Sequence, residues 1–306
     1  MAIQKGMFII NGVERALYWE AEKDTLADVL RRYGLTGLKV GCAAGQCGTC
    51  TIIVDGEPVR SCIKKMSKVP EYSKIETIEG IGTASNLHPL QRAWIKYGGV
   101  QCGFCTTGFI MSAKALLDKN PNVTREDVRN WFTKNNNLCR CTGYKPLVDA
   151  VMAAAAVMNG SAPITSLNPS IPKGNSIHTS HYPRPAALGK VMGVTDYGGD
   201  ICLKMPENML HMAVKLTDYA HANVISIDVS EAEKMPGVVK VITQKDVKGT
   251  NDMGGAQGSR SLIRSDHTYV LIGEGMRVRR RGEAIALVVA RTREEARAAA
   301  QKVKVE

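Results

Sequence analysis

Eight of the nine cysteines fall into two groups of four in the first half of this 306-residue chain. The first group has the spacing Cys42-x4-Cys47-x2-Cys50-x11-Cys62. This is the plant-type pattern that binds a [2Fe–2S] cluster, with three thiolates on one loop and the fourth from later in the chain. Because such clusters carry single electrons, the spacing predicts an electron-transfer function.

The second group consists of two pairs, Cys102 with Cys105 and Cys139 with Cys141. It matches no generic pattern, but two converging pairs would supply four soft ligands for iron or zinc. Each pair precedes a predicted helix, where free N–H groups and the positive end of the helix dipole stabilise thiolates. The two groups therefore predict two metal centres.

Zinc and disulfides are the alternatives for these cysteines. Structural zinc sites usually pair their ligands in short knuckles, and a C-x4-C-x2-C run in a glycine-rich loop is unusual for them. The N-terminus has no signal peptide, which predicts a cytoplasmic, reducing location where disulfides are rare. The spacing favours iron–sulfur clusters, with zinc as the remaining alternative. Cys202 lies far from both groups and is expected to be a buried, small hydrophobic residue.

The residues around the first group are expected to form a small sheet. Asn11-Gly12 and Asp55-Gly56 are strong hairpin signals between strand-like runs. Thr25 begins a short helix with a capping box, and Gly34 ends it. Glycines in the loop 41–50 allow left-handed turns that direct backbone N–H groups towards an anionic cluster. This order of elements is that of a β-grasp, and residues 1–80 resemble a plant-type [2Fe–2S] ferredoxin domain.

Residues 81–160 are expected to form a compact arrangement of four short helices around the second group of cysteines. The helix signals are a proline in a first turn, capping boxes and apolar stripes at helical spacing. The predicted helices run from Pro89 to Gly98, over 107–118, from Thr124 onward, and from Pro146 to Gly160.

The sequences 101–109 and 139–144, which contain the second group, resemble the second iron–sulfur domain of the molybdenum hydroxylases, the xanthine oxidase-like family. Residues 182–185 and 193–200 are similar to the opening of the molybdenum-binding portion, and the likeness continues around His221 and Asp228. Within the family, the chain is most similar to the flavin-free aldehyde oxidoreductases of anaerobic bacteria.

The expected fold is an α+β multidomain architecture. It comprises a β-grasp [2Fe–2S] ferredoxin domain (1–80), a four-helix [2Fe–2S] domain (81–160), a linker (161–195) and the start of an α/β molybdenum-binding domain (196–306). The linker is rich in proline, serine and glycine, has no apolar period and is expected to form no helix or strand.

The last domain is expected to be incomplete. Strand-like runs at 212–216, 238–243 and 285–290 alternate with a helix that starts after the capping residue Thr292. Residues 302–306 alternate like a further strand, for which the sequence offers no partner. This predicts that the remainder of the molybdenum domain lies on the same, longer chain or on a partner chain.

The resemblance also implies a role for individual residues. Gln101 would hydrogen-bond the pterin of a molybdopterin-type molybdenum cofactor, although a helix-end amide is the simpler interpretation of the residue alone. Cys141 would ligate iron and face the same pterin. The family's catalytic base lies outside this sequence. The implied ligands are Cys42, Cys47, Cys50 and Cys62 for the first cluster, and Cys102, Cys105, Cys139 and Cys141 for the second.

The activity implied by the resemblance is oxidation of aldehydes to carboxylic acids with water. Electrons would pass from the molybdenum cofactor to the second cluster, then to the first, and then to a flavodoxin or ferredoxin. The short linker leaves no space for a flavin domain, so no FAD is expected. The alternatives are a purine, nicotinate or carbon monoxide oxidising member, or a non-enzymatic electron carrier with two clusters. The choice of molybdenum or tungsten stays open, and a homodimer is expected.

Composition adds limits to these expectations. The formal net charge of +11 is spread along the chain, which argues against a nucleic-acid site. The sequence contains no apolar run of membrane-spanning length, so no membrane span is expected. His178 and His181 are close in sequence but have no third ligand nearby, and they are not expected to bind metal.

Overall fold

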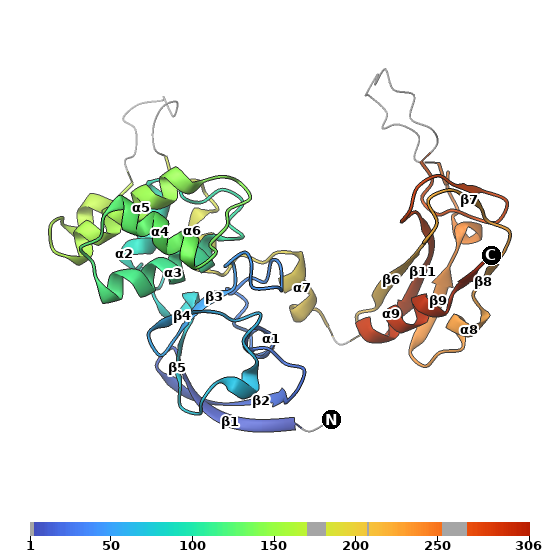
Figure 1. The fold of residues 1–306 in the computed structure, drawn as a ribbon, viewed down its shortest axis with the longest axis horizontal. Helices are drawn as coiled ribbons and strands as arrows, with labels where there is room; N and C mark the ends of the chain where they lie inside the picture. Colours follow the sequence, from blue (N-terminus) through green and yellow to red (C-terminus); the bar gives the residue numbers. More distant parts are fainter. Residues whose placement is uncertain (1–2, 170–181, 207, 253–267) are drawn as a thin grey trace, which may run out of the picture. The chain divides into compact units, whose positions relative to one another are not determined.

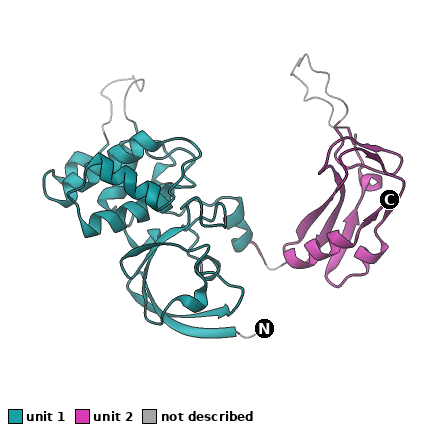
Figure 2. Ribbon diagram, viewed as in Figure 1, with its two compact units in different colours: residues 1–204 teal, residues 205–306 magenta. Residues whose placement is uncertain are grey.

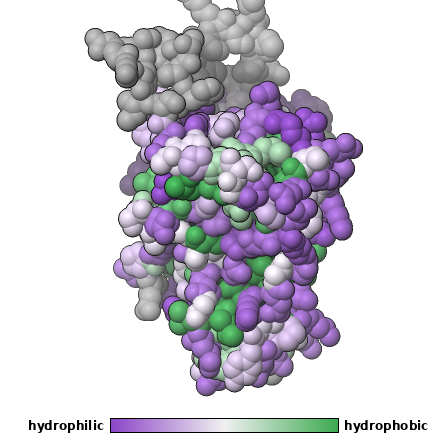
Figure 3. All heavy atoms as spheres, turned by 90° about the vertical axis from the view of Figure 1, so that its left-hand side faces the viewer, coloured by the Kyte–Doolittle hydropathy of each residue, from purple (hydrophilic) through white to green (hydrophobic). Residues whose placement is uncertain are grey.

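The computed structural model describes residues 3–169, 182–206, 208–252 and 268–306, and the chain divides into two compact units, 1–204 and 205–306 (Figures 1 and 2). The histidines at 178 and 181 lie outside the described residues. None of the helices in the described parts is both long enough and apolar enough to cross a membrane. On the face drawn in Figure 3, apolar residues form several separate groups among mostly hydrophilic ones.

The first unit begins with a five-stranded sheet of strand order β2-β1-β5-β3-β4, in which β1 and β5 are parallel. The turn between β1 and β2 uses positive φ angles at Asn11 and Gly12, as the hairpin signal predicts. The side chains of Phe8, Leu17 and Ile52, which belong to these strands, are fully buried. The strands are β1 (Ile3–Ile10), β2 (Val13–Glu20), β3 (Thr51–Val54), β4 (Glu57–Arg60) and β5 (Lys74–Glu76).

Helix α1 (Leu26–Arg32) contributes Leu26, Val29 and Leu30 to the same core. Its N-terminus has the predicted capping box, in which the Thr25 hydroxyl oxygen accepts from the Asp28 N–H at 3.2 Å. Two short 3-10 helices complete this region: η1 (Met66–Lys68) follows β4, and η2 (Ile78–Gly80) follows β5. The β-grasp prediction is confirmed.

Four helices follow and share a second core that contains the fully buried Trp94 and Phe109 (Figure 1). The four-helix prediction is confirmed, with small shifts at the ends. The last helix begins at Tyr144, before the predicted start at Pro146, and the first and last helices end at Lys96 and Met158, two residues before the predicted glycines. The helices are α2 (Pro89–Lys96), α3 (Thr106–Lys119), α4 (Arg125–Lys134) and α5 (Tyr144–Met158).

The expectation that residues 161–195 form no helix is wrong for the described part of that segment. It contains η3 (Ile164–Leu167) and α6 (Ala187–Val191), and α7 (Gly198–Lys204) follows. Leu167, Ala187 and Val191 are buried in the core of the four helices. One or two buried apolar residues are enough to hold a single helical turn against a core that is already formed. Because one or two apolar residues make no periodic pattern, the sequence gives no signal for such a turn.

The second unit is built on a three-stranded antiparallel sheet, β6-β11-β9. Helix α9 (Arg293–Lys302), capped by Thr292 as predicted, buries Ala296, Ala299 and Ala300. The predicted strands are confirmed as β6 (His211–Leu216), β9 (Val238–Ile242) and β11 (Ala284–Ala290). The smaller elements are β7 (Ala222–Asn223), β8 (Ile227–Asp228), α8 (Ser230–Glu233), η4 (Gln244–Asp246), β10 (Arg277–Val278) and β12 (Lys304–Val305).

Two further expectations are wrong. The strand near the C-terminus has a partner, because Lys304 and Val305 pair with Asp228 and Ile227 of β8. Alternation reveals a strand but not a partner so distant in the sequence. Cys202 is exposed, not buried, because it lies on α7, where only Asp200 is buried.

Candidate metal centres

The first four cysteines come together on one side of the β-grasp. Cys42, Cys47 and Cys50 lie on the loop between α1 and β3, and Cys62 follows β4. Their side chains interact in two pairs, Cys42 with Cys47 and Cys50 with Cys62. Cys42 is exposed, whereas Cys50 and Cys62 are buried. The group therefore has one end open to solvent and one end closed.

Backbone N–H groups point at these sulfurs. Ala44 and Gln46 each donate to Cys42 Sγ at 3.3 Å, and Cys62 donates to Cys50 Sγ at 3.4 Å. Burial raises the pKa of Cys42, but the N–H groups of Ala44 and Gln46, together with Cys47, lower it to about 7. Burial raises the pKa of Cys50 to about 12. The loop thus offers fixed donors to anionic sulfur at its exposed end.

Glycine is required where this loop turns or is approached closely. Gly45 and Gly48 have φ angles of +70° and +62°. A Cβ at Gly48 would lie 2.6 Å from Asn137 Nδ2, and one at Gly41 would lie 3.1 Å from Cys47 Sγ. The predicted role of glycine is confirmed at these positions.

The second four cysteines are brought together from distant segments. Cys105 is the N-cap of α3, and Cys139 and Cys141 shortly precede α5, as predicted. The thiols pair across the segments, Cys102 with Cys141 and Cys105 with Cys139. Burial, together with the neighbouring thiols, raises the pKa of Cys102 and of Cys105. Each pair thus contains one cysteine from each segment.

The paired arrangement fits a two-iron cluster. Each iron of a [2Fe–2S] cluster takes two cysteine ligands, so four thiols in two pairs are the required donor set. Within the described parts of the chain, no three histidine, cysteine or acidic side chains are arranged to hold a metal ion, so the cluster assignment rests on the pairing of the thiols. Both groups of cysteines have the donor chemistry and the pairing that a [2Fe–2S] cluster needs.

Gln101 lies beside the second group of cysteines and is half-buried. A Cβ at Gly143 would lie 3.0 Å from Gln101 Nε2 and 3.8 Å from Cys139 Sγ, which places the amide at the edge of the site. Hydrogen bonds from Cys102, and then the charges of Arg184 and Lys190, lower the pKa of Cys141. Gln101 and Cys141 therefore belong to the same corner of the molecule.

A hydrogen bond joins the two groups of cysteines. The Leu138 N–H donates to the Cys47 carbonyl at 3.1 Å, and Leu138 is bonded in sequence to Cys139. The Asn137 Nδ2 donates to the Gly48 carbonyl at 3.4 Å. The sequence analysis missed Asn137 and Leu138, for which the only available signal was their position next to Cys139.

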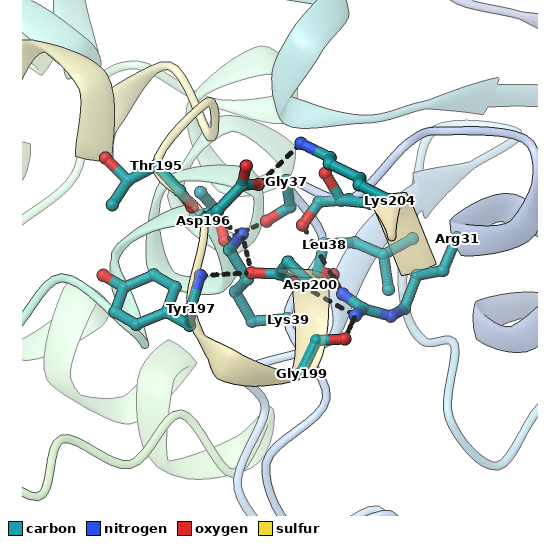
Figure 4. Close-up of polar contacts among 12 residues, drawn as sticks. Arg31, Gly37, Leu38, Lys39, Thr195, Asp196, Tyr197, Gly199, Asp200 and Lys204 are labelled. Atoms are coloured by element: carbon teal, nitrogen blue, oxygen red, sulfur yellow. Dashed lines mark hydrogen bonds and ion pairs between the residues drawn. The ribbon is translucent and has the colours of Figure 1, made fainter. Parts of the chain in front are cut away.

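Residues 195–204 are fixed to the rest of the first unit by a buried ion cluster (Figure 4). Asp200 is 2% exposed, and its carboxylate oxygens lie 2.7 Å from Lys39 Nζ and 2.7 Å from Arg31 Nη2. Lys39 Nζ also donates to the Thr195 carbonyl at 2.9 Å. The Tyr197 hydroxyl donates to the Cys102 carbonyl at 2.7 Å. This segment therefore contacts both the α1 region and the loop of the second group.

Three family models match the chain. The 2Fe-2S iron-sulfur cluster binding domain matches residues 8–75, and the [2Fe-2S] binding domain matches residues 77–152. The a/b hammerhead domain of aldehyde oxidase and xanthine dehydrogenase matches residues 193–306.

Individual relatives agree with these models. The chain is 53% identical over 305 residues to an aldehyde oxidoreductase of Megalodesulfovibrio gigas. The matched region is 99% of this chain and 33% of that protein. A solved aldehyde oxidoreductase from Desulfovibrio gigas matches over 99% of this chain and 33% of its own, at 52% identity and a TM-score of 0.92. The chain thus spans about a third of the length of these relatives.

A shorter relative matches the cysteine-rich part alone. The nicotinate dehydrogenase small FeS subunit of Eubacterium barkeri is 44% identical over 146 residues, which are 47% of this chain and 90% of that subunit. With both groups of cysteines paired as two-iron clusters require, and with matches along its whole length, the chain belongs to the molybdenum hydroxylase, or xanthine oxidase-like, family.

Proposed function

We propose that this chain is the iron–sulfur electron-transfer portion of a molybdenum-dependent aldehyde oxidoreductase, which oxidises aldehydes to carboxylic acids with water. The observation that carries the proposal is the pairing of all eight cysteines into two four-thiol sites. The assignment to aldehydes is supported by the 53% identity to an aldehyde oxidoreductase over 305 residues, whereas a nicotinate relative matches only 146.

The proposed ligands follow the observed pairs. Cys42 and Cys47 would hold one iron of the first cluster, and Cys50 and Cys62 would hold the other. Cys102 and Cys141 would hold one iron of the second cluster, and Cys105 and Cys139 would hold the other. Bound clusters would supply one-electron chemistry, and the N–H groups that donate to Cys42 and Cys50 would stabilise the charge on sulfur. The proposed domains are 1–80, 81–160, the linker 161–195, and 196–306.

The proposed direction of electron flow is from the second site to the first and then outward. The hydrogen bond from Leu138 N–H to the Cys47 carbonyl provides a short link between ligands of the two sites, since Leu138 adjoins Cys139. Each site has one exposed ligand, Cys42 in the first and Cys102 in the second, and the proposal places the acceptor at the first and the molybdenum cofactor at the second. The proposed acceptor is a flavodoxin or ferredoxin, and the proposed protein contains no FAD, is cytoplasmic and forms a homodimer.

Gln101 and Cys141 are proposed to contact the pterin of a molybdopterin-type cofactor, which would be completed by residues outside this sequence. Support comes from the place of Gln101 Nε2 at the edge of the second site and from Lys190 and Arg184, whose charges act on Cys141. The catalytic base is likewise proposed to lie outside this sequence.

The function is tested on the native enzyme by metal analysis, EPR and substrate oxidation. We expect two distinct [2Fe–2S] signals on reduction, molybdenum in place of tungsten, and faster turnover of aldehydes than of purines, nicotinate or carbon monoxide. Zinc in the cysteine sites or a single EPR signal would refute the cluster assignment. Preference for a purine or nicotinate would replace the proposed substrate class and leave the electron-transfer role intact.

The pterin contact is tested with Gln101→Ala in the same enzyme. Loss of a buried hydrogen bond of about 1–3 kcal/mol should lower molybdenum content while iron content stays unchanged. Leu188→Ala, at an exposed apolar position of the same unit, is the control. Full molybdenum content and full activity in Gln101→Ala would return the residue to the role of a helix-end amide.

A further inference from the structure

Lys190 of α6 lies over the loop that carries Cys102 and Cys105. Its Nζ donates to the Gln101 carbonyl at 3.0 Å, immediately before Cys102. Its side-chain carbons cover Gly103, where a Cβ would lie 2.4 Å from Lys190 Cδ. Gly103 also has a φ of +87°, so both the backbone conformation and the close lysine require glycine at this position.

The charge of Lys190 has no acidic partner among the described residues, where its polar contact is the Gln101 carbonyl. The side chain is half-buried, so its ammonium group is less screened by water than that of a fully exposed lysine. This charge lies on the loop of Cys102 and Cys105, since Nζ is hydrogen-bonded to the carbonyl before Cys102 and the side-chain carbons cover Gly103. A fixed cation is therefore held against the second site.

We propose that Lys190 sets the reduction potential of the second cluster, raising it by its charge without ligating iron. The inference rests on the proposed function for the presence of that cluster. Four thiolates give a [2Fe–2S] centre a net negative charge, and reduction adds one more electron. A nearby fixed cation stabilises the reduced state more than the oxidised state, and net charge is one of the factors that set such potentials.

The first site has a matched residue. Arg60 Nη1 donates to the Gly45 carbonyl at 3.1 Å, in the loop of Cys42 and Cys47. Each site thus has a cation that is hydrogen-bonded to a carbonyl of its own loop and comes from an element outside that loop, in addition to the charge of Arg184 near the second site. The two cations can be removed separately, which provides an internal control for each site.

The test is an EPR-monitored redox titration of the intact enzyme carrying Lys190→Gln, which removes the charge but keeps an N–H donor. We expect the equilibrium constant for reduction of the second cluster to fall by on the order of tenfold, which is 59 mV for a one-electron couple. The first cluster should keep its midpoint. Lys190→Arg should restore the midpoint of the second cluster, a result that a purely structural role would not produce.

Arg60→Gln is the matched control and should shift the first midpoint alone. If Lys190→Gln loses iron, Lys190→Met and Lys190→Arg decide the question through the clusters that remain. Unchanged midpoints in enzyme that retains both clusters, or equal shifts of both, would overturn the inference. Absence of the two signals from the unmodified enzyme would instead refute the proposed function, so the two failures are distinguishable.

Discussion

The two cysteine groups reach similar pairings by different routes. The first takes three members from one loop of nine residues, Cys42 to Cys50, whose turns are made by glycine and whose donors are neighbouring N–H groups. The second joins Cys102 and Cys105 to a segment more than thirty residues away. The first site is thus mainly a property of local sequence, and the second is a property of the folded helices.

This contrast predicts different dependence on the surrounding core. The first loop needs the β-grasp core, which holds β3 and β4 next to it. The second site needs α3 and α5 docked together, because the segments that lead into these two helices each supply one member of every pair. Changes in the helical core should therefore disturb the second site first.

The largest expected effect is loss of one cluster at a time. Cys42→Ser should remove about half of the iron and the first EPR signal, because one iron loses a ligand. Cys139→Ser should remove the second signal and leave the first. The measurement is iron per chain together with EPR of the reduced protein. Loss of both signals in Cys42→Ser would show that the two sites do not form independently.

The part of the fold that the sequence predicts is the part encoded locally. The hairpin at Asn11-Gly12 and the capping boxes at Thr25, Thr124 and Thr292 all form as expected. Each depends on contacts between residues at most three or four apart, which a short stretch of sequence contains in full. The loop of the first site belongs to the same class.

The rest depends on contacts that no local pattern contains. Asp200 meets Lys39 across 161 positions, and the short helix α6 is held by the core of the four helices. The partner of β12 and the exposure of Cys202 likewise follow from packing. Such features require knowledge of which surfaces meet, and one sequence supplies only their composition.

The next largest effect is expected at the ion cluster that ties α7 to the rest of the first unit. Asp200→Asn leaves Lys39 buried without a counter-charge, which should cost about 3–5 kcal/mol of unfolding free energy. Asp196→Asn is the matched control, because its ion pair with Lys204 is exposed and should contribute less than about 1 kcal/mol. Urea denaturation measures both, and equal effects would contradict the prediction.

The same ion cluster predicts a pH dependence. Burial alone would raise the pKa of Asp200, but hydrogen bonds from Lys39, Tyr197 and Arg31 lower it below the ordinary value of 3.8. A carboxylate whose pKa is lowered in the folded state stabilises the fold at pH values above its ordinary pKa. This stabilisation is lost as the pH falls from the ordinary pKa through the lowered pKa of the folded state. The acid-side loss of stability should be smaller in Asp200→Asn than in the unmodified protein. If the free energy of unfolding fell equally steeply with decreasing pH in both proteins, Asp200 would not be a source of the pH dependence.

A smaller effect is expected where the helices meet the first loop. A Cβ at Gly108 of α3 would lie 2.5 Å from the Gly48 carbonyl oxygen and 2.6 Å from that of Thr49. Gly108→Ala should therefore cost about 1–3 kcal/mol through overpacking and should broaden the first EPR signal. Gly198→Ala, which enters open space, is the control. The prediction would be wrong if Gly108→Ala were as stable as the unmodified protein and changed only the EPR signal of the second cluster.

The smallest effect is expected at the surface beside the first loop. Residues 60–68 contain four basic side chains and no acidic one, and exposed Ile63 packs against Gly45 of the loop. If electrons leave at this site to an acidic flavodoxin, Lys68→Glu should slow reduction of the flavodoxin several-fold at low salt. The effect should fade at high salt, because screening weakens steering between exposed charges.

Lys134→Glu on α4 is the comparison for this charge reversal, since Lys134 is also exposed but lies among the helices of the second site. Reduction of a small neutral dye should be unchanged in both variants, because a dye needs no charged docking surface. Equal slowing by the two variants would mean that net charge, and not the surface beside the first loop, governs the transfer. Slowing by Lys134→Glu alone would place the exit at the second site and reverse the proposed order of the two clusters.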